Sequence, residues 1–341
     1  NKMKPGYNFF DSLDDEELLD IRRRTKADVL WILDIWEIGD FRRWGTGGGS
    51  PYAIKGYRVK PDLGGEAGLK SFIERAHRLG FKVALDEIPN HVSLDSDLVK
   101  EHPEALLHMV PPQHLSEAEI MAAVPRQTHG DHAPVFFLVE NDHYPENGRR
   151  VKKRVLLHHP LTDFGGDMWV DMAQRDFSRP VTRAQESAEV RRLHAELGVD
   201  MVRRDMSYEV LNARFYPRWL KILSDERDRS SGWVRDEMDR MIAAFQERWA
   251  ALGGAEYLEE ATRNSQAAVP HAAAIDEAYS NFTELSRSGS SAVYNKNDHD
   301  LSMGQAGLYD SMTSGDGRRI RAALRHIAFR RWQKGGAGSL Q

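Results

Sequence analysis

The chain has 341 residues, of which 40% are hydrophobic and 29% are charged, a composition typical of a globular protein. Its formal net charge of -5 gives no sign of a nucleic-acid-binding or membrane-binding surface, so we expect neither as a partner, and no apolar run approaches the ~18 residues of a membrane span. Cysteine is absent, which excludes disulfides and thiolate metal sites and leaves the redox compartment open.

Helix and strand patterns alternate along the first part of the chain. Ser12 is expected to cap a helix over residues 12–24, and the apolar run at 27–33 (ADVLWIL) predicts a strand. Residues 81–91 (FKVALDEIPNH) predict a second strand that runs into polar residues. The helix expected between them, over 64–80, carries apolar residues at helical spacing and stops at a glycine: Leu69, Phe72, Ile73, Ala76 and Leu79.

Residues 92–168 interrupt this alternation. The segment contains prolines and histidines, and its apolar residues do not recur at helical spacing. VFFLVEN (135–141) predicts a strand within it. We expect an inserted subdomain on one strand–helix loop.

Alternation resumes with a helix at 182–198 and a strand at 199–205. The next helix has the clearest apolar stripe, which ends before Gly253: Met238, Met241, Ile242, Phe245, Trp249 and Leu252. Three further strands and a last helix are expected at 255–261, 274–282, 290–300 and 318–332. Repeated strand–helix units of this kind predict a parallel sheet, open or closed.

Polar residues stand where the expected strands end. A single acid at a strand end usually caps the next helix, but four strands here end in charged groups, which favours a functional rim: Asp86–His91, Arg203–Asp205, Glu259–Glu260 and Asn297–Asp300. Since residues two apart share a face of a strand, Arg203 is expected to lie beside Asp205 and keep it ionised, as a carboxylate nucleophile requires.

Glu260 follows Tyr257 and Leu258 in a more apolar strand end, where a glutamate can retain and donate a proton. A carboxylate pair that divides these roles is the chemistry of glycoside cleavage, and in retaining enzymes the two groups stand about 5–5.5 Å apart.

The motifs, in this order along the chain, resemble the α-amylase family of retaining glycoside hydrolases and transglycosylases. The segments that carry the resemblance are SPYAIKGYRVKPDLGG (50–65), DEIPNH (86–91), MWVDMAQRDFSRP (168–180), GVDMVRRD (198–205), YLEEA (257–261) and DHD (298–300). The resemblance implies an α/β fold, a (β/α)8 TIM barrel with an inserted subdomain after the third strand.

The barrel is expected to be incomplete at both ends. GYNFF (6–10) reads as a remnant of the first strand, and no eighth strand or C-terminal β-sandwich is obvious. The expected division is a first part of the barrel at 1–91, a domain B-like subdomain at 92–168, and the remainder of the barrel at 169–341.

Carried over position by position, the resemblance makes Asp205 the nucleophile, Glu260 the general acid/base and Asp300 the carboxylate that binds sugar hydroxyls. Glu256 competes with Glu260, which we prefer because it stands at the end of its strand. The expected substrate-binding residues are Tyr52, Asp86, His91, Arg203 and His299.

No cofactor is required by this chemistry, although in some members a calcium ion lies near the position of Asn90. Four aspartates in or near the insert have oxygen ligands suited to calcium: Asp95, Asp97, Asp142 and Asp171. Two residues depart from the family pattern, since Arg204 stands where an aliphatic residue is usual and Asp298 where asparagine is usual.

The resemblance implies an enzyme that cleaves α-glucosidic bonds of an oligosaccharide or α-glucan with retention, through a covalent glycosyl-enzyme intermediate. The alternatives are a transglycosylase or sugar-isomerising member of the same family, and a catalytically silent carbohydrate-binding homologue.

Overall fold

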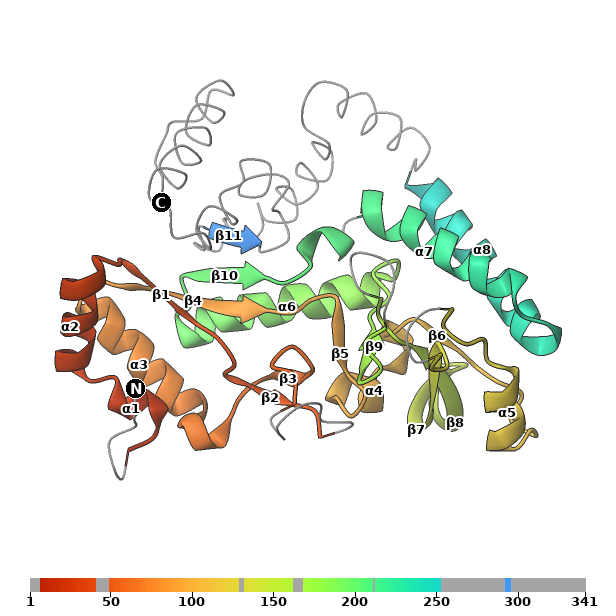
Figure 1. The fold of residues 1–341 in the computed structure, drawn as a ribbon, viewed down its shortest axis with the longest axis horizontal. Helices are drawn as coiled ribbons and strands as arrows, with labels where there is room; N and C mark the ends of the chain where they lie inside the picture. The colour runs from red at the N-terminus through yellow and green to blue at the C-terminus, as the bar shows by residue number, and fades with distance from the viewer. Residues whose placement is uncertain are drawn as a thin grey trace, which may run out of the picture.

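A four-stranded parallel sheet organises the chain (Figure 1). The structure, a computed structural model, describes residues 7–40, 49–128, 132–161, 168–210, 212–252 and 292–295. The strand order is β1-β4-β10-β11. The bounds are β1 (Val29–Ile32), β4 (Lys82–Glu87), β10 (Met201–Arg204) and β11 (Ala292–Asn295).

Helices cover one face of this sheet. The two longest are α3 (Gly65–Arg78) and α6 (Pro180–Leu197), with α2 (Asp15–Thr25) at the red end of the molecule in Figure 1. Val83 and Leu85 of β4 point into the apolar core between sheet and helices, together with the stripe predicted on α3. Because side chains alternate along a strand, Ala84 and Asp86 lie on the opposite face.

The helix predicted over 12–24 begins later than expected. Residues Phe9–Ser12 form a short helix α1, capped by Asn8, so the prediction of a strand remnant over GYNFF is wrong. The cap of α2 is Asp14 and not Ser12: its carboxylate accepts a hydrogen bond from the Glu17 N–H at 3.0 Å. Acidic residues in the first turn and three arginines in the last complement the helix dipole.

Two short antiparallel pairs adjoin the sheet. β2 (Trp36–Ile38) pairs with β3 (Ile54–Val59), which the short helix η1 (Pro61–Leu63) connects to α3. β5 (His91–Ser93) pairs with β9 (Met172–Gln174), so the chain returns beside the point where it left β4.

Between β5 and β9 the chain builds a separate three-stranded sheet of order β6-β8-β7. The strand expected at VFFLVEN is the start of β7, and β8, which the sequence reading did not predict, follows it through the turn Asn147–Gly148 with positive φ at both residues. The elements are α4 (Asp97–Glu101), η2 (Pro103–Ala105), β6 (His108–Met109), α5 (Glu117–Ala123), β7 (Phe136–Glu146) and β8 (Arg149–His158).

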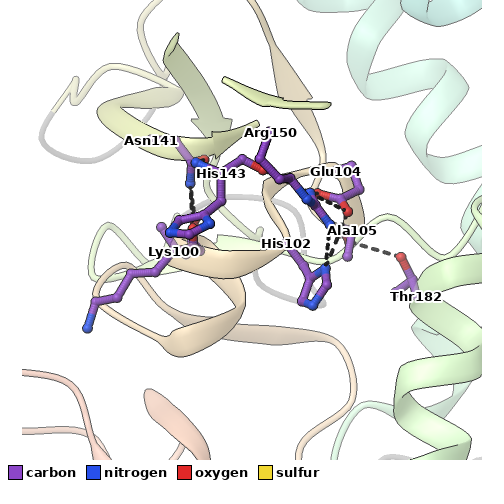
Figure 2. Close-up of polar contacts among 9 residues, drawn as sticks. Lys100, His102, Glu104, Ala105, Asn141, His143, Arg150 and Thr182 are labelled. Atoms are coloured by element: carbon purple, nitrogen blue, oxygen red, sulfur yellow. Dashed lines mark hydrogen bonds and ion pairs between the residues drawn. The ribbon is translucent and has the colours of Figure 1, made fainter. Parts of the chain in front are cut away.

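Polar contacts tie the β7–β8 hairpin to the segment before it (Figure 2). Asn141 donates to the carbonyls of Val99 and Lys100, at 2.6 and 3.0 Å, and Arg150 pairs with Glu104 at 3.0 Å. The Thr182 hydroxyl of α6 donates to the carbonyl of Ala105 at 3.0 Å, so α6 is joined to the same segment.

After β10 the chain forms η3 (Ser207–Val210) and the neighbouring helices α7 (Asn212–Asp228) and α8 (Gly232–Ala251). The stripe predicted on α8 is buried at Met238, Ile242 and Phe245, but Leu252 lies beyond the end of the helix and is 51% exposed, so its assignment to the stripe is wrong. None of the helices in the described ranges is both long and apolar enough to cross a membrane.

The position of β11 differs from that of a barrel built in chain order. In such a barrel the strand expected at 255–261 would pair with β10, whereas β11 pairs with β10 directly. The strands expected at 255–261 and 274–282 lie outside the described residues. Within the described ranges the sheet is open and parallel, without a closed barrel.

Replacing Phe72 by alanine tests the core between α3 and the sheet. The ring is fully buried, so its loss is expected to lower the free energy of unfolding by about 3–5 kcal/mol. The matched control is Glu74→Ala, two residues further on the exposed face of the same helix, with an expected change within about 0.5 kcal/mol. Equal effects of the two substitutions in urea unfolding would contradict this packing.

Candidate active site

The ends of β4 and β10 lie side by side. In the parallel register Asp86 stands opposite Arg203 and Glu87 opposite Arg204, and the Asp205 N–H donates to the Glu87 carbonyl at 2.7 Å. Two segments that are far apart in the sequence, DEIPNH and VRRD, therefore meet at one edge of the sheet. This is the edge at which parallel-sheet enzymes place their reacting groups.

Asp86 is buried and held by two tryptophans. Its Oδ1 accepts a hydrogen bond from Trp31 Nε1 at 2.9 Å, and its backbone carbonyl accepts one from Trp36 Nε1 at 2.8 Å. The side chain is 3% exposed, and that of Asp205 is 7% exposed. Carboxylates at such depth are costly unless they are hydrogen-bonded, and the Trp31 N–H meets this need at Asp86.

The side chains of Arg203 and Arg204 are outside the described part of the structure, so the ion pair predicted between Arg203 and Asp205 stays a prediction. The register does place Arg204 opposite Glu87, whose side chain is fully buried on the helix-covered face of β4. The residue that departs from the family pattern thus stands opposite a buried acid.

His91 offers a buried donor. The Asn90 Nδ2 donates to its Nδ1 at 3.3 Å, and the orientation of the amide is fixed because Asn90 Oδ1 accepts from Gln174 Nε2 at 3.0 Å. A neutral His91 ring therefore carries its proton on Nε2. That nitrogen is buried and has no hydrogen-bond partner among the described residues. The Trp169 ring lies against the imidazole, with 5.1 Å between the ring centroids.

His91 is held in its neutral form. Burial, and to a smaller extent the charge of Arg175, lower the pKa of His91 to about 3, while the backbone of Tyr52 favours the protonated form. This contact also brings Tyr52, from the loop before β3, close to His91. A neutral imidazole N–H suits a hydroxyl group of a ligand.

The predicted calcium ligands are engaged elsewhere. Asn90 uses its amide on Gln174 and His91, and Lys55 and Arg58 pair with the carboxylates of Asp95 and Asp97. Among the described residues no three acidic or histidine side chains gather as a metal site. Asn90, Asp95 and Asp97 therefore do not fit a calcium ion as they stand, and we assign no step of the chemistry to one.

Three of the predicted site residues lie outside the described residues, namely Glu260, His299 and Asp300. Of the others, the structure brings Asp86, His91, Tyr52 and Asp205 to one edge of the sheet. The sequence reading missed the residues that support them: Trp31, Tyr57, Trp169, Gln174, Arg175 and Glu186. Four of these, Tyr57, Trp169, Gln174 and Arg175, belong to the segments 50–65 and 168–180 that carry the family resemblance. Arg175, a charged residue among apolar ones in MAQRDF, was the feature of the sequence that could have indicated a supporting role.

The arrangement is that of an α/β protein with acids and a histidine at the carboxyl edge of a parallel sheet. No family model matches the chain. Over 100 residues it is 35% identical to the α-1,4-glucan:maltose-1-phosphate maltosyltransferase of Salinibacter ruber, a match covering 24% of this chain and 15% of that protein.

Solved structures that it is similar to include a noncanonic maltogenic α-amylase from Thermotoga neapolitana, with 24% identity, a TM-score of 0.40 and coverage of 65% of this chain and 41% of that one. Another is the trehalose-6-phosphate hydrolase of Bacillus licheniformis, with 16% identity, a TM-score of 0.43 and coverage of 67% and 39%. The chain spans less than half of the length of each of these three proteins. The match to the maltosyltransferase agrees with the resemblance to the α-amylase family that the motifs predict.

The neutral state of His91 predicts a pH dependence of stability. Its pKa is about 3 in the folded chain and about 6.5 when unfolded, so the unfolded chain binds the extra proton between these values. Stability is therefore expected to fall as pH decreases from 6.5 toward 3, by up to about 1.4 kcal/mol per pH unit from this group.

His91→Gln removes the titrating group while keeping a polar side chain. Urea unfolding at pH 4, 5, 6 and 7 is expected to show a shallower pH dependence for this variant than for the wild type. His114→Gln, at an exposed histidine, is the matched control and should reproduce the wild-type slope. Equal slopes for all three proteins would contradict a neutral buried His91.

Proposed function

We propose that the protein is a retaining enzyme acting on α-glucosidic bonds of oligosaccharides or α-glucans. The observation that carries the proposal is the β4–β10 register, which brings the strand ends that carry Asp86 and Asp205 together, at the same edge as the buried Nε2 of His91. The names of the similar proteins, a maltosyltransferase and a maltogenic α-amylase, support the same substrate class.

In the proposed reaction the Asp205 carboxylate attacks the anomeric carbon, and Glu260 donates a proton to the departing glycosidic oxygen. Glu260 then takes a proton from water or from a sugar hydroxyl, which attacks the glycosyl-enzyme on the same face and restores the α configuration. Asp300 and His299 bind hydroxyls of the reacting sugar in this scheme. Arg203 orients Asp205 and keeps it ionised.

The described residues supply the binding side of this reaction. In this scheme a sugar hydroxyl is the partner of His91 Nε2, the Trp169 ring lies near the same imidazole, and Tyr52 offers an aromatic face to the sugar. We also propose that 92–168 is a subdomain inserted into a (β/α)8 barrel, because β5 and β9 pair at its base and bring the chain back beside β4.

The protein is expected to convert maltooligosaccharides with retention of the α-anomer in the first product, as followed by proton NMR. Asp205→Asn removes the nucleophile and should lower kcat by about 10⁴-fold or more. The matched control is Asp200→Asn, at the opposite end of the same strand, where the carboxylate serves the Val83 N–H; its kcat should stay within about twofold.

The anomeric configuration of the first product and the identity of the acceptor distinguish the proposed hydrolase from the alternative functions. Release of reducing sugar indicates a hydrolase, and longer or rearranged saccharides indicate a transglycosylase or an isomerising enzyme. Saccharide binding without turnover would replace the proposal by a carbohydrate-binding protein. Unchanged turnover in Asp205→Asn, or a β-anomer as first product, would contradict the assigned mechanism.

A further inference from the structure

The connection between β4 and β5, residues 88–90, leads to His91 and belongs to no regular element. Its backbone groups cannot be satisfied by a sheet, yet they are buried. Buried backbone N–H and C=O groups need partners, so side chains from elsewhere must supply them.

Arg175 supplies most of these partners. Its Nη1 donates to the Pro89 carbonyl at 3.1 Å and pairs with Glu186, and its Nη2 donates to the Thr182 carbonyl at 3.3 Å. The Arg175 backbone N–H donates to the Asn90 carbonyl at 3.1 Å. One residue therefore holds two consecutive carbonyls just before His91.

Tyr57 extends the chain of contacts to the next backbone group. Its hydroxyl accepts the Ile88 N–H at 2.8 Å and donates to Glu186 at 3.3 Å. Burial and the charge of Glu186 raise the pKa of Tyr57 well above its ordinary value, so the hydroxyl keeps the proton that it donates. Ile88 and Pro89 are thus held by side chains that meet at Glu186, and Asn90 is held by the backbone of Arg175.

We propose that the buried Arg175–Glu186 pair, together with Tyr57, is a positioning device that fixes the 88–90 connection and so aims His91 at the substrate. This inference rests on the proposed function, since it assumes that His91 contacts a sugar. Arg175, Glu186 and Tyr57 are positioning residues and contact no substrate themselves.

Stability alone does not account for this pair. Both side chains are 5% exposed, and removing two charges from water costs about as much as their attraction returns, so apolar residues of similar volume are often equally stable in such places. The pair does something that apolar residues cannot do: it donates to the carbonyl of Pro89 and orders the hydroxyl of Tyr57.

Helix α6 is the rigid support of the device. Thr182 and Glu186 are four residues apart and lie on one face of the helix. Thr182 also donates to the carbonyl of Ala105, as Figure 2 shows, so the same helical turns hold η2 and the 88–90 connection. The imidazole is therefore aimed by a helix, which is a stiffer support than a loop.

The test compares Arg175→Met, Glu186→Leu and the double variant with the wild-type protein. Each single change leaves one buried group without its partner and is expected to lower Tm. The double variant is expected to regain most of the wild-type Tm while its kcat falls about 10- to 100-fold with little change in KM, since misplacing a reacting group by about 1 Å has effects of this size.

Two tyrosine variants test the contribution of Tyr57 to the positioning device. Tyr57→Phe removes the hydroxyl that bridges Ile88 and Glu186 and should lower kcat. Tyr144→Phe, whose hydroxyl contacts His108 on β6, is the matched control and should not. A double Arg175/Glu186 variant with wild-type Tm, kcat and KM would overturn the proposal.

Amide hydrogen exchange of the peptide spanning 86–91 tests the device without any substrate. Exchange is expected to be faster in the double variant and in Tyr57→Phe than in the wild type and Tyr144→Phe. Faster exchange in these variants, with a wild-type protein that converts no α-glucoside, would support the positioning device and reject the proposed function. Unchanged exchange in the double variant would reject the positioning device, whatever the activity of the protein.

Discussion

One backbone hydrogen bond, from the Asp205 N–H to the Glu87 carbonyl, holds the ends of β4 and β10 level with each other. The side-chain period of a strand is two, so a register slip of one residue would turn Asp86 toward the helices and Glu87 toward the site. The core opposes that slip, because Val83 and Leu85 would leave their apolar contacts. The apolar packing of the sheet thereby determines which acids meet at its edge.

This arrangement buries polar groups, which costs free energy unless each group finds a hydrogen-bond partner. The structure provides such partners for most of them. Two tryptophan N–H groups serve Asp86, Gln174 fixes Asn90, and Arg175 satisfies the connection before His91. His91 Nε2 is left without a partner among the described residues. A buried donor that is rigidly held and unsatisfied is prepared for a ligand hydroxyl, because binding then restores a hydrogen bond that folding removed.

Periodicity in the sequence predicted α3 and most of α8, where apolar stripes face a core, and strand ends located Asp86, His91 and Asp205. It missed α7, because Pro217 interrupts the pattern and only the packing of Phe215, Tyr216 and Trp219 makes the helix. It missed β8, which is largely basic, although Asn147–Gly148 is a hairpin signal. The Arg175–Glu186–Tyr57 contacts join residues up to 129 apart in the chain, and no local pattern encodes them.

The most direct test of the account is to trap the glycosyl-enzyme intermediate. In an α-glucosyl fluoride with a second fluorine at C5, loss of the anomeric fluoride is fast and breakdown of the intermediate is slow, so the sugar accumulates on the nucleophile. Digestion and mass spectrometry are expected to find one fluoroglucosyl group, on Asp205. A group on another carboxylate, or none in a protein that turns the reagent over, would contradict the account.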